Sequence, residues 1–205
     1  MTPKGTKLTD GRHQMPDAIE LLRRDHEEVK AMLSELEKGP VAADGADENQ
    51  VMLRKRMTEQ LIIEESKHEA VEEEYFWPAV REHVADGNRL ADHAIDQEQR
   101  AKRVLDRLDK LEASDPQFET LLGEFIAAGR EHISFEETQV WPALLAVLSG
   151  EQLRELGGKL EAAKQVAPTR PHPNVPPSPG ILKATGPAAA VADRIRDTVT
   201  GRDAP

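Results

Sequence analysis

Cysteine is absent from the 205-residue chain. This excludes disulfide bonds, thiolate zinc sites, thiol nucleophiles and cysteine-held iron–sulfur clusters, so any metal must be held by imidazole and oxygen ligands. Aromatic residues are also scarce, at 3% of the chain. Because Glu, Leu, Ala, Arg and Lys are abundant and β-branched runs are few, the composition favours helices over sheets. An all-α fold is therefore predicted.

An excess of positive charge is missing too, since the formal net charge is -11. Nucleic-acid backbones and anionic membrane surfaces would be repelled on average, so neither is an expected partner. No stretch approaches the roughly 18 apolar residues that a membrane span needs, and the N-terminal MTPKGTKLTDGRHQMP lacks the apolar core of a signal peptide. We expect a cytoplasmic protein.

Apolar residues recur at steps of three and four along the chain, which predicts four long helices. The helices run from about Pro16 to Gly39, from the end of a loop at Asn49 to Asp86, from Asn88 to Glu112, and from Asp115 or Pro116 to about Leu148. A short extra helix is expected from Glu151 to Lys164. Its two consecutive glycines weaken it by about 1 kcal/mol each relative to alanine.

After Ala167 the run PTRPHPNVPPSPG cannot continue a helix and indicates an extended linker. Val191, Ile195 and Val199 align on a helical segment too short to be stable alone. The predicted organisation is an N-terminal arm (1–15), a four-helix bundle (16–148), a short accessory helix (149–166) and a flexible Pro-rich linker with a Pro/Ala-rich tail (167–205).

An internal repeat relates the two halves of the bundle. The motif His-x3-Glu-x4-Trp-Pro occurs twice, and the helix before each copy carries an Asp-His pair. These repeated elements are His68, Glu72, Trp77 and Pro78; His132, Glu136, Trp141 and Pro142; and the pairs Asp25-His26 and Asp92-His93. The chain is therefore predicted to be a duplicated helix pair that forms an antiparallel up-down bundle.

Residues four apart share one helix face, so each His-x3-Glu pair directs an imidazole and a carboxylate toward the same point. Such groups are costly to bury unless a cation compensates them. Imidazole with carboxylate suits iron, manganese or zinc, and two carboxylates across the axis can bridge two metals. The predicted metal ligands are His26, His68, Glu72, His93, His132 and Glu136.

The order of these motifs resembles the hemerythrin-like (HHE cation-binding) family from Asp17 to about Leu148. The resemblance implies two Fe ions with an oxo or hydroxo bridge, four terminal histidines, and bridging by Glu72 and Glu136. Oxygen-carrying hemerythrins have a fifth histidine one turn after the third-helix ligand, where this chain has Gln97. We therefore expect open coordination positions and a reaction with oxygen, peroxide or nitric oxide, fed by an unidentified electron donor.

Several alternatives remain open. Glu73 or Glu137, five residues after a histidine, could replace the neighbouring glutamate, and a zinc-only site is conceivable. The protein could instead be an iron or oxygen sensor that signals through its tail, or an iron storage or delivery protein. No specific reaction or catalytic residue is predicted; peroxidase-like, catalase-like and nitric-oxide-consuming activities are the enzyme hypotheses. Tyr75 and the Trp-Pro pairs are assigned packing roles.

Overall fold

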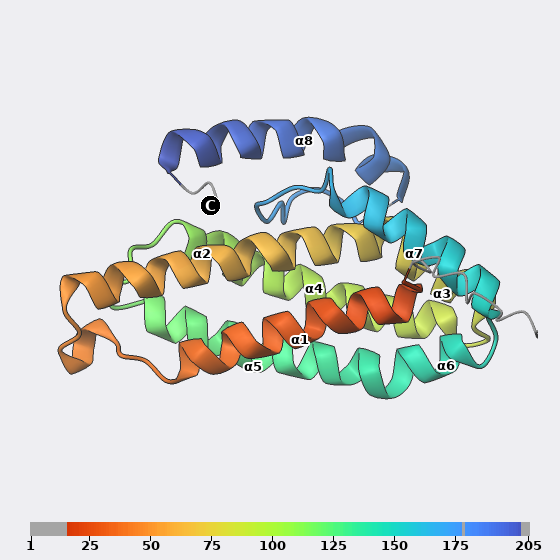
Figure 1. Ribbon diagram of the computed structural model, residues 1–205, viewed down its shortest axis with the longest axis horizontal. Coiled ribbons are helices and arrows are strands. Elements are labelled where there is room, and N and C mark those ends of the chain that lie inside the picture. Colours follow the sequence, from red (N-terminus) through yellow and green to blue (C-terminus); the bar gives the residue numbers. More distant parts are fainter. Residues whose placement is uncertain (1–15, 178, 202–205) are drawn as a thin grey trace, which may run out of the picture.

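The computed structural model describes residues 16–177 and 179–201, and all regular secondary structure in these ranges is helical (Figure 1). Four long helices, each antiparallel to the next, enclose a common core. They are α1 (Ala18–Glu37), α2 (Glu48–Val71), α4 (Gly87–Asp109) and α5 (Phe118–Phe135). The predicted all-α, up-down four-helix bundle is confirmed. The expected N-terminal arm, residues 1–15, lies outside the described residues.

Acidic caps begin the first two long helices. The Asp17 carboxylate accepts a hydrogen bond from the Glu20 amide, and the Glu20 carboxylate accepts one from the Asp17 amide. Asp47 and Gln50 repeat this arrangement at the start of α2, after the 3₁₀ turn η1 (Ala42–Asp44). Each reciprocal pair satisfies amide groups that the first helical turn leaves without partners, so these start points follow from local sequence.

The repeated Trp-Pro pair produces the same irregularity twice. The α2 helix passes through a π-helical segment, η2 (Glu72–Phe76), into α3 (Trp77–His83), and α5 passes through η3 (Glu136–Val140) into α6 (Trp141–Leu145). In both copies the tryptophan amide donates to the carbonyl of the glutamate five residues earlier. The proline that follows has no amide to donate and would clash with a tightly wound preceding turn. The motif therefore places a widened turn directly after each His-x3-Glu pair.

The core consists of two apolar clusters. One contains Phe76, Trp77 and Trp141, and the other contains Phe118 and Phe125. Each long helix has a buried polar residue near the point where its apolar residues change from one cluster to the other. These residues are His26, His68, Glu98 and His132. The bundle therefore carries one buried polar layer across its middle.

Two further helices cover the bundle. The accessory helix α7 (Gly150–Lys164) packs against α1 and α2. A Cβ on Gly157 would lie 2.5 Å from the Pro16 carbonyl oxygen, so this glycine allows the close approach of α7 to the start of α1. None of the helices in residues 16–177 and 179–201 is both long and apolar enough to cross a membrane.

The C-terminal segment differs from the expected flexible linker and tail. It forms α8 (Pro179–Thr200), which folds back along the bundle (Figure 1). The Arg170 guanidinium lies 2.7 Å from an Asp197 oxygen, and His172 Nε2 lies 2.9 Å from Asp193 Oδ2. An ion pair and a histidine–carboxylate hydrogen bond made by the preceding loop therefore hold a helix that local propensity does not specify. Its aligned apolar residues face outward, with exposed fractions of 56% for Val191 and 62% for Ile195.

Candidate metal centre

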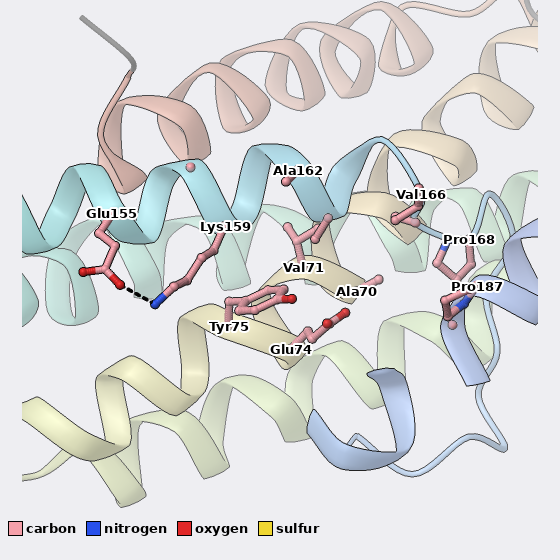
Figure 2. A pocket seen from close by; sticks show the side chains of 14 residues that line it. Ala70, Val71, Glu74, Tyr75, Glu155, Lys159, Ala162, Val166, Pro168 and Pro187 are labelled. Atoms are coloured by element: carbon pink, nitrogen blue, oxygen red, sulfur yellow. Dashed lines mark ion pairs between the residues drawn. The ribbon is translucent and has the colours of Figure 1, made fainter. Parts of the chain in front are cut away.

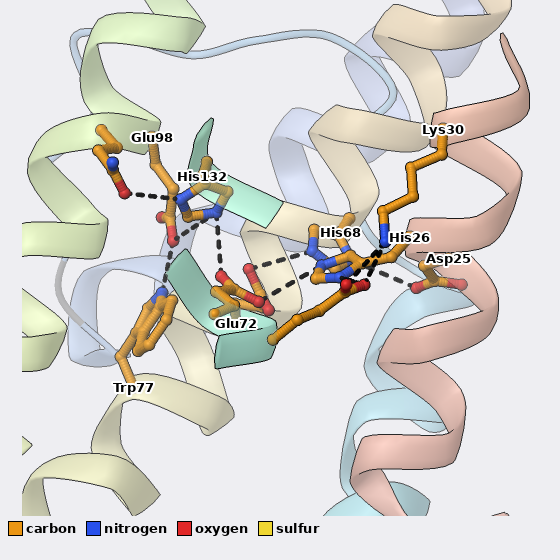
Figure 3. A network of polar contacts seen from close by, with 11 residues as sticks. Asp25, His26, Lys30, His68, Glu72, Trp77, Glu98 and His132 are labelled. Atoms are coloured by element: carbon orange, nitrogen blue, oxygen red, sulfur yellow. Dashed lines mark hydrogen bonds and ion pairs between the residues drawn. The ribbon is translucent and has the colours of Figure 1, made fainter. Parts of the chain in front are cut away.

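The polar layer combines side chains from all four long helices and both π-helical segments (Figure 3). Its inward members are three imidazoles and three carboxylates, all buried: His26 on α1, His68 on α2, Glu72 at the start of η2, Glu98 on α4, His132 on α5 and Glu136 at the start of η3. Because the two glutamates that begin η2 and η3 follow their histidines by one turn, each pair reaches the same depth in the bundle.

These side chains form two groups of four in which the ligand atoms lie within 4.8 Å of one another. We call them position A (His26, His68, Glu72 and Glu136) and position B (Glu72, Glu98, His132 and Glu136). Glu72 and Glu136 belong to both. The Glu136 carboxylate illustrates this sharing, because one oxygen is 3.4 Å from His26 Nε2 and the other is 3.0 Å from His132 Nε2. Two carboxylates thus connect two clusters of donors.

The histidines of position A are oriented by carboxylates outside the cluster. His26 Nδ1 lies 3.2 Å from Glu137 Oε1, and His68 Nδ1 lies 3.4 Å from Asp25 Oδ2. Each carboxylate is paired with an ammonium group, Lys30 for Glu137 and Lys164 for Asp25. A proton held on Nδ1 by these partners leaves Nε2 as a lone-pair donor that points inward.

Position B has uncharged outer partners. His132 Nδ1 lies 3.2 Å from the Gln97 amide oxygen. The Trp77 indole N–H donates to Glu98 Oε1 at 2.5 Å, which leaves the other Glu98 oxygen available to the cluster (Figure 3). Gln97 therefore orients a ligand candidate and is not one itself.

Apart from imidazole–carboxylate contacts of 3.0–3.4 Å within the cluster itself, the inward atoms have no hydrogen-bond partners among the described residues. These atoms are Nε2 of His26, His68 and His132, both carboxylate oxygens of Glu72 and Glu136, and Oε2 of Glu98. Buried polar atoms without partners are costly, and so many converging at one depth are rare in folded proteins. A pair of cations would satisfy all of them together, because each atom is a nitrogen or oxygen lone-pair donor. The residues present fit a bound metal centre.

Proton affinities in the cluster are strongly perturbed. Burial, together with the nearby Glu73 carboxylate, raises the pKa of Glu98 well above its usual value. Burial lowers the pKa of His132, but the surrounding carboxylates, Glu136 foremost and then Glu72 and Glu69, together outweigh burial and raise that pKa to about 9. Burial likewise opposes ionisation of Glu136, yet the imidazoles of His132 and His26 hold its pKa below the usual range. Metal ions would therefore compete with protons for these sites.

Five of the six residues predicted as ligands are brought together, and His93 is not. It is exposed on α4, where its ring lies 4.6 Å from the ring of Phe135. In the structure Glu98, which lies on the same helix α4, belongs to the cluster in place of His93. The α4 helix is rotated so that Ala94 and Glu98 face the core, while His93 lies one residue to the side.

Several contacts around the cluster were not predicted from the sequence. Trp77 and Trp141 were assigned packing roles, yet the first donates to Glu98 and the second stacks on His26 with ring centroids 4.8 Å apart. Glu137 orients His26, and Glu73 is buried in an ion pair with Lys102 at 2.7 Å. Neither residue belongs to positions A and B. Spacing alone could not distinguish an inward ligand from a neighbour that supports it.

A hollow of about 500 Å³ lies outside the cluster, between α7, η2 and the residues Gly186 and Pro187 of α8 (Figure 2). Tyr75 lines this hollow together with Ala70, Val71 and Lys159. Its hydroxyl therefore faces the outer groove, and no residue of positions A and B lines the hollow. The hollow and the polar layer are separate features of the molecule.

The fold and the buried donor set define a metal-binding helical bundle. A hemerythrin HHE cation-binding domain matches residues 17–144, and the chain belongs to that family. An uncharacterized hemerythrin-like protein of Schizosaccharomyces pombe is 27% identical over 143 residues, covering 69% of this chain and 70% of that protein. A DNA nickase of a Nostoc species is 24% identical over 161 residues, covering 78% of this chain but only 43% of the nickase.

A solved structure shares the fold. The crystal structure of a hemerythrin HHE cation-binding domain-containing protein from Mycobacterium kansasii matches with a TM-score of 0.60 and 22% sequence identity. The match covers 87% of this chain and 99% of that protein. The coverage extends beyond the residues of the family domain, so helices outside the four-helix bundle also have counterparts there.

Proposed function

We propose that the chain is a non-haem di-iron protein that reacts with oxygen, peroxide or nitric oxide. The observation that carries this proposal is the sharing of Glu72 and Glu136 between positions A and B. Carboxylates shared between two nitrogen-containing donor sets are suited to bridging a metal pair. A single zinc ion in a closed tetrahedral site would leave the second group of donors without a cation.

The protein side chains have distinct roles in this proposal. His26 and His68 hold one metal, Glu98 and His132 hold the other, and the shared glutamates hold both. Iron bound there would supply reversible one-electron chemistry toward small oxidants. With metal bound, the chain itself would supply three imidazole Nε2 donors, a cluster screened from water, and outer hydrogen bonds that fix ligand orientation.

The donor count favours small-ligand binding. Positions A and B each offer four protein residues, and iron commonly accepts about six ligands. The Gln97 amide oxygen lies 3.2 Å from His132 Nδ1, on the outer side of that imidazole, so Gln97 does not add a ligand to either metal position. Small molecules therefore have room to bind, which supports reaction with them over saturated, purely structural metal binding.

Metal analysis with Mössbauer and visible spectroscopy tests the di-iron centre. The purified chain is expected to contain about two coupled iron ions per chain. His132→Ala is expected to lose iron from position B, while Glu119→Gln, which alters an ion pair with Arg54 away from the cluster, is expected to keep it. One iron or none in the wild type would contradict the proposal.

Reactivity is tested separately by anaerobic reduction followed by oxygen, peroxide or nitric oxide. Rapid irreversible oxidation, or consumption of peroxide or nitric oxide over several cycles with added reductant, is the expected result. A stable and fully reversible oxygenated spectrum would instead identify an oxygen carrier. Nicking of DNA, the activity named for the Nostoc relative, is not adopted because the net charge of -11 opposes binding to a polyanion.

A sensor that signals through the C-terminal helices is the second candidate. Lys164 on α7 lies 2.6 Å from Asp25, which contacts the Nδ1 side of His68. The α8 helix packs against η2, which begins with Glu72. Hydrogen exchange tests the coupling: a sensor requires the protection of α8 to change on metal binding. Identical protection of α8 with and without metal would exclude this candidate.

A further inference from the structure

Positions A and B differ in their donor atoms, and this difference rests on the two-metal centre proposed above. Position A combines two imidazoles with the two shared carboxylates. Position B combines one imidazole with the same carboxylates and adds a third, Glu98. Position A is therefore richer in nitrogen, and position B is richer in oxygen because it has one more carboxyl group.

The outer contacts increase this difference. The imidazoles of position A face the carboxylates of Glu137 and Asp25, which draw the Nδ1 proton and make Nε2 a stronger donor. The imidazole of position B faces the uncharged Gln97 amide, which does so less. The outer partner of Glu98, the Trp77 indole N–H, is uncharged as well.

Metals respond differently to these two environments. Imidazole donors suit iron well, whereas carboxylate-rich sites suit manganese, which gains less from nitrogen ligands. We infer that the two positions select different metals, with iron favoured at position A and manganese accepted chiefly at position B, so that the chain can assemble a mixed manganese–iron centre. Glu98 is the residue that creates the selectivity.

The α4 helix contributes Glu98, and not its histidine His93, to position B. A histidine at position 98 would give each metal two imidazoles and remove the difference between them. The chain instead places its third-helix histidine, His93, on the surface and directs Glu98 inward. Trp77 then holds Glu98 by one oxygen and leaves Oε2 toward the cluster.

Crystals of the full chain provide the test. Metal-free protein is loaded anaerobically with equal amounts of Mn(II) and Fe(II) salts, total metal is measured by mass spectrometry, and anomalous scattering is recorded at the manganese and iron absorption edges. The ratio of manganese to iron is expected to be about tenfold higher at position B than at position A. Equal ratios, a higher ratio at position A, or iron alone at both positions would overturn the inference.

Two variants test the cause of the selectivity. Glu98→His is expected to bring the ratio at position B close to that at position A, and Glu98→Gln, which preserves side-chain shape, is expected to reduce the difference. Glu119→Gln is the matched control, since it changes a partly buried ion pair of another glutamate with Arg54, and its ratios should equal those of the wild type. Retention of the full selectivity in both Glu98 variants would overturn the assignment.

The outcomes separate this inference from the proposed function. Two metals per chain with the same composition at both positions would leave the two-metal centre intact and contradict only the selectivity. Fewer than two metals in the wild type would contradict the two-metal centre itself and the inference with it.

Discussion

At the scale of single residues, the two tryptophans show how one motif acquires two roles. Trp77 and Trp141 occupy equivalent places in the repeat, and both are buried. The Trp77 indole N–H donates to Glu98, whereas the Trp141 indole N–H has no hydrogen-bond partner among the described residues. Trp141 contacts His26 through its ring face instead. The two positions can therefore be compared by the same substitution.

Trp77→Phe is expected to weaken metal binding at position B by about tenfold, because Glu98 loses the donor that orients it. Metal titration followed by mass spectrometry measures the effect. Trp141→Phe is the matched control: it keeps an aromatic ring against His26 and removes an N–H that is not used. Equal metal affinity in the two variants would show that the Trp77 hydrogen bond does not support the site.

The protonation of the cluster predicts how the stability of the metal-free chain depends on pH. Because the pKa of His132 is raised from 6.5 to about 9, its stabilisation is present below pH 6.5 and is lost as pH rises through 9. Burial raises the pKa of Glu69 from 4.5 to about 8, so its ionisation also costs stability as pH rises toward 8. Calorimetry of the metal-free chain should show Tm falling between pH 6.5 and 9. The fall should be smaller with metal bound, and a rising Tm in the metal-free chain would contradict this account.

At the scale of elements, two helical glycines, Gly157 and Gly123, have opposite effects on stability. Gly157 lies on α7, where an added Cβ would be 2.5 Å from the Pro16 carbonyl oxygen. Gly123 lies on the exposed side of α5, where an added Cβ would meet nothing within 4 Å. The first glycine serves packing between helices, and the second only lowers helix propensity.

Alanine substitutions test this distinction. Gly157→Ala is expected to destabilise the chain by about 1–3 kcal/mol, because α7 must move away from α1. Gly123→Ala is expected to stabilise it by about 0.5–1 kcal/mol through helix propensity alone. Denaturant unfolding measures both changes. If both variants became more stable, α7 would not be held as closely to α1 as the structure shows.

At the scale of the whole molecule, the polar layer divides the apolar core into two clusters that bound cations would hold together. Removal of the metals leaves six converging side chains that repel or share protons. Metal-free protein should therefore unfold at a lower temperature than metal-loaded protein, by roughly 5–10 °C when free metal exceeds the Kd about a hundredfold. Calorimetry before and after chelation and reloading measures the shift. Equal Tm values in the two forms would contradict coupling of the centre to folding.

The amino-acid sequence by itself determined the helical fold, the repeated motif and most of the donor set. Helix periodicity, capping pairs such as Asp17 with Glu20, and the repeated His-x3-Glu spacing are local properties, so they are readable without tertiary information. Five of the six residues predicted as ligands converge for this reason.

Only the tertiary structure decided which face of α4 is buried, what holds α8, and which partner each ligand candidate has. His93 and Glu98 both lie near a plausible apolar stripe, and packing of α4 against its neighbours selects the stripe that includes Ala94, Glu98 and Ala101. The α8 helix is held by an ion pair with Arg170 and a hydrogen bond with His172 of the preceding loop, and no local pattern specifies these contacts. Helix rotation and long-range pairing depend on the sum of many contacts, so a stripe one residue away cannot be separated by periodicity alone.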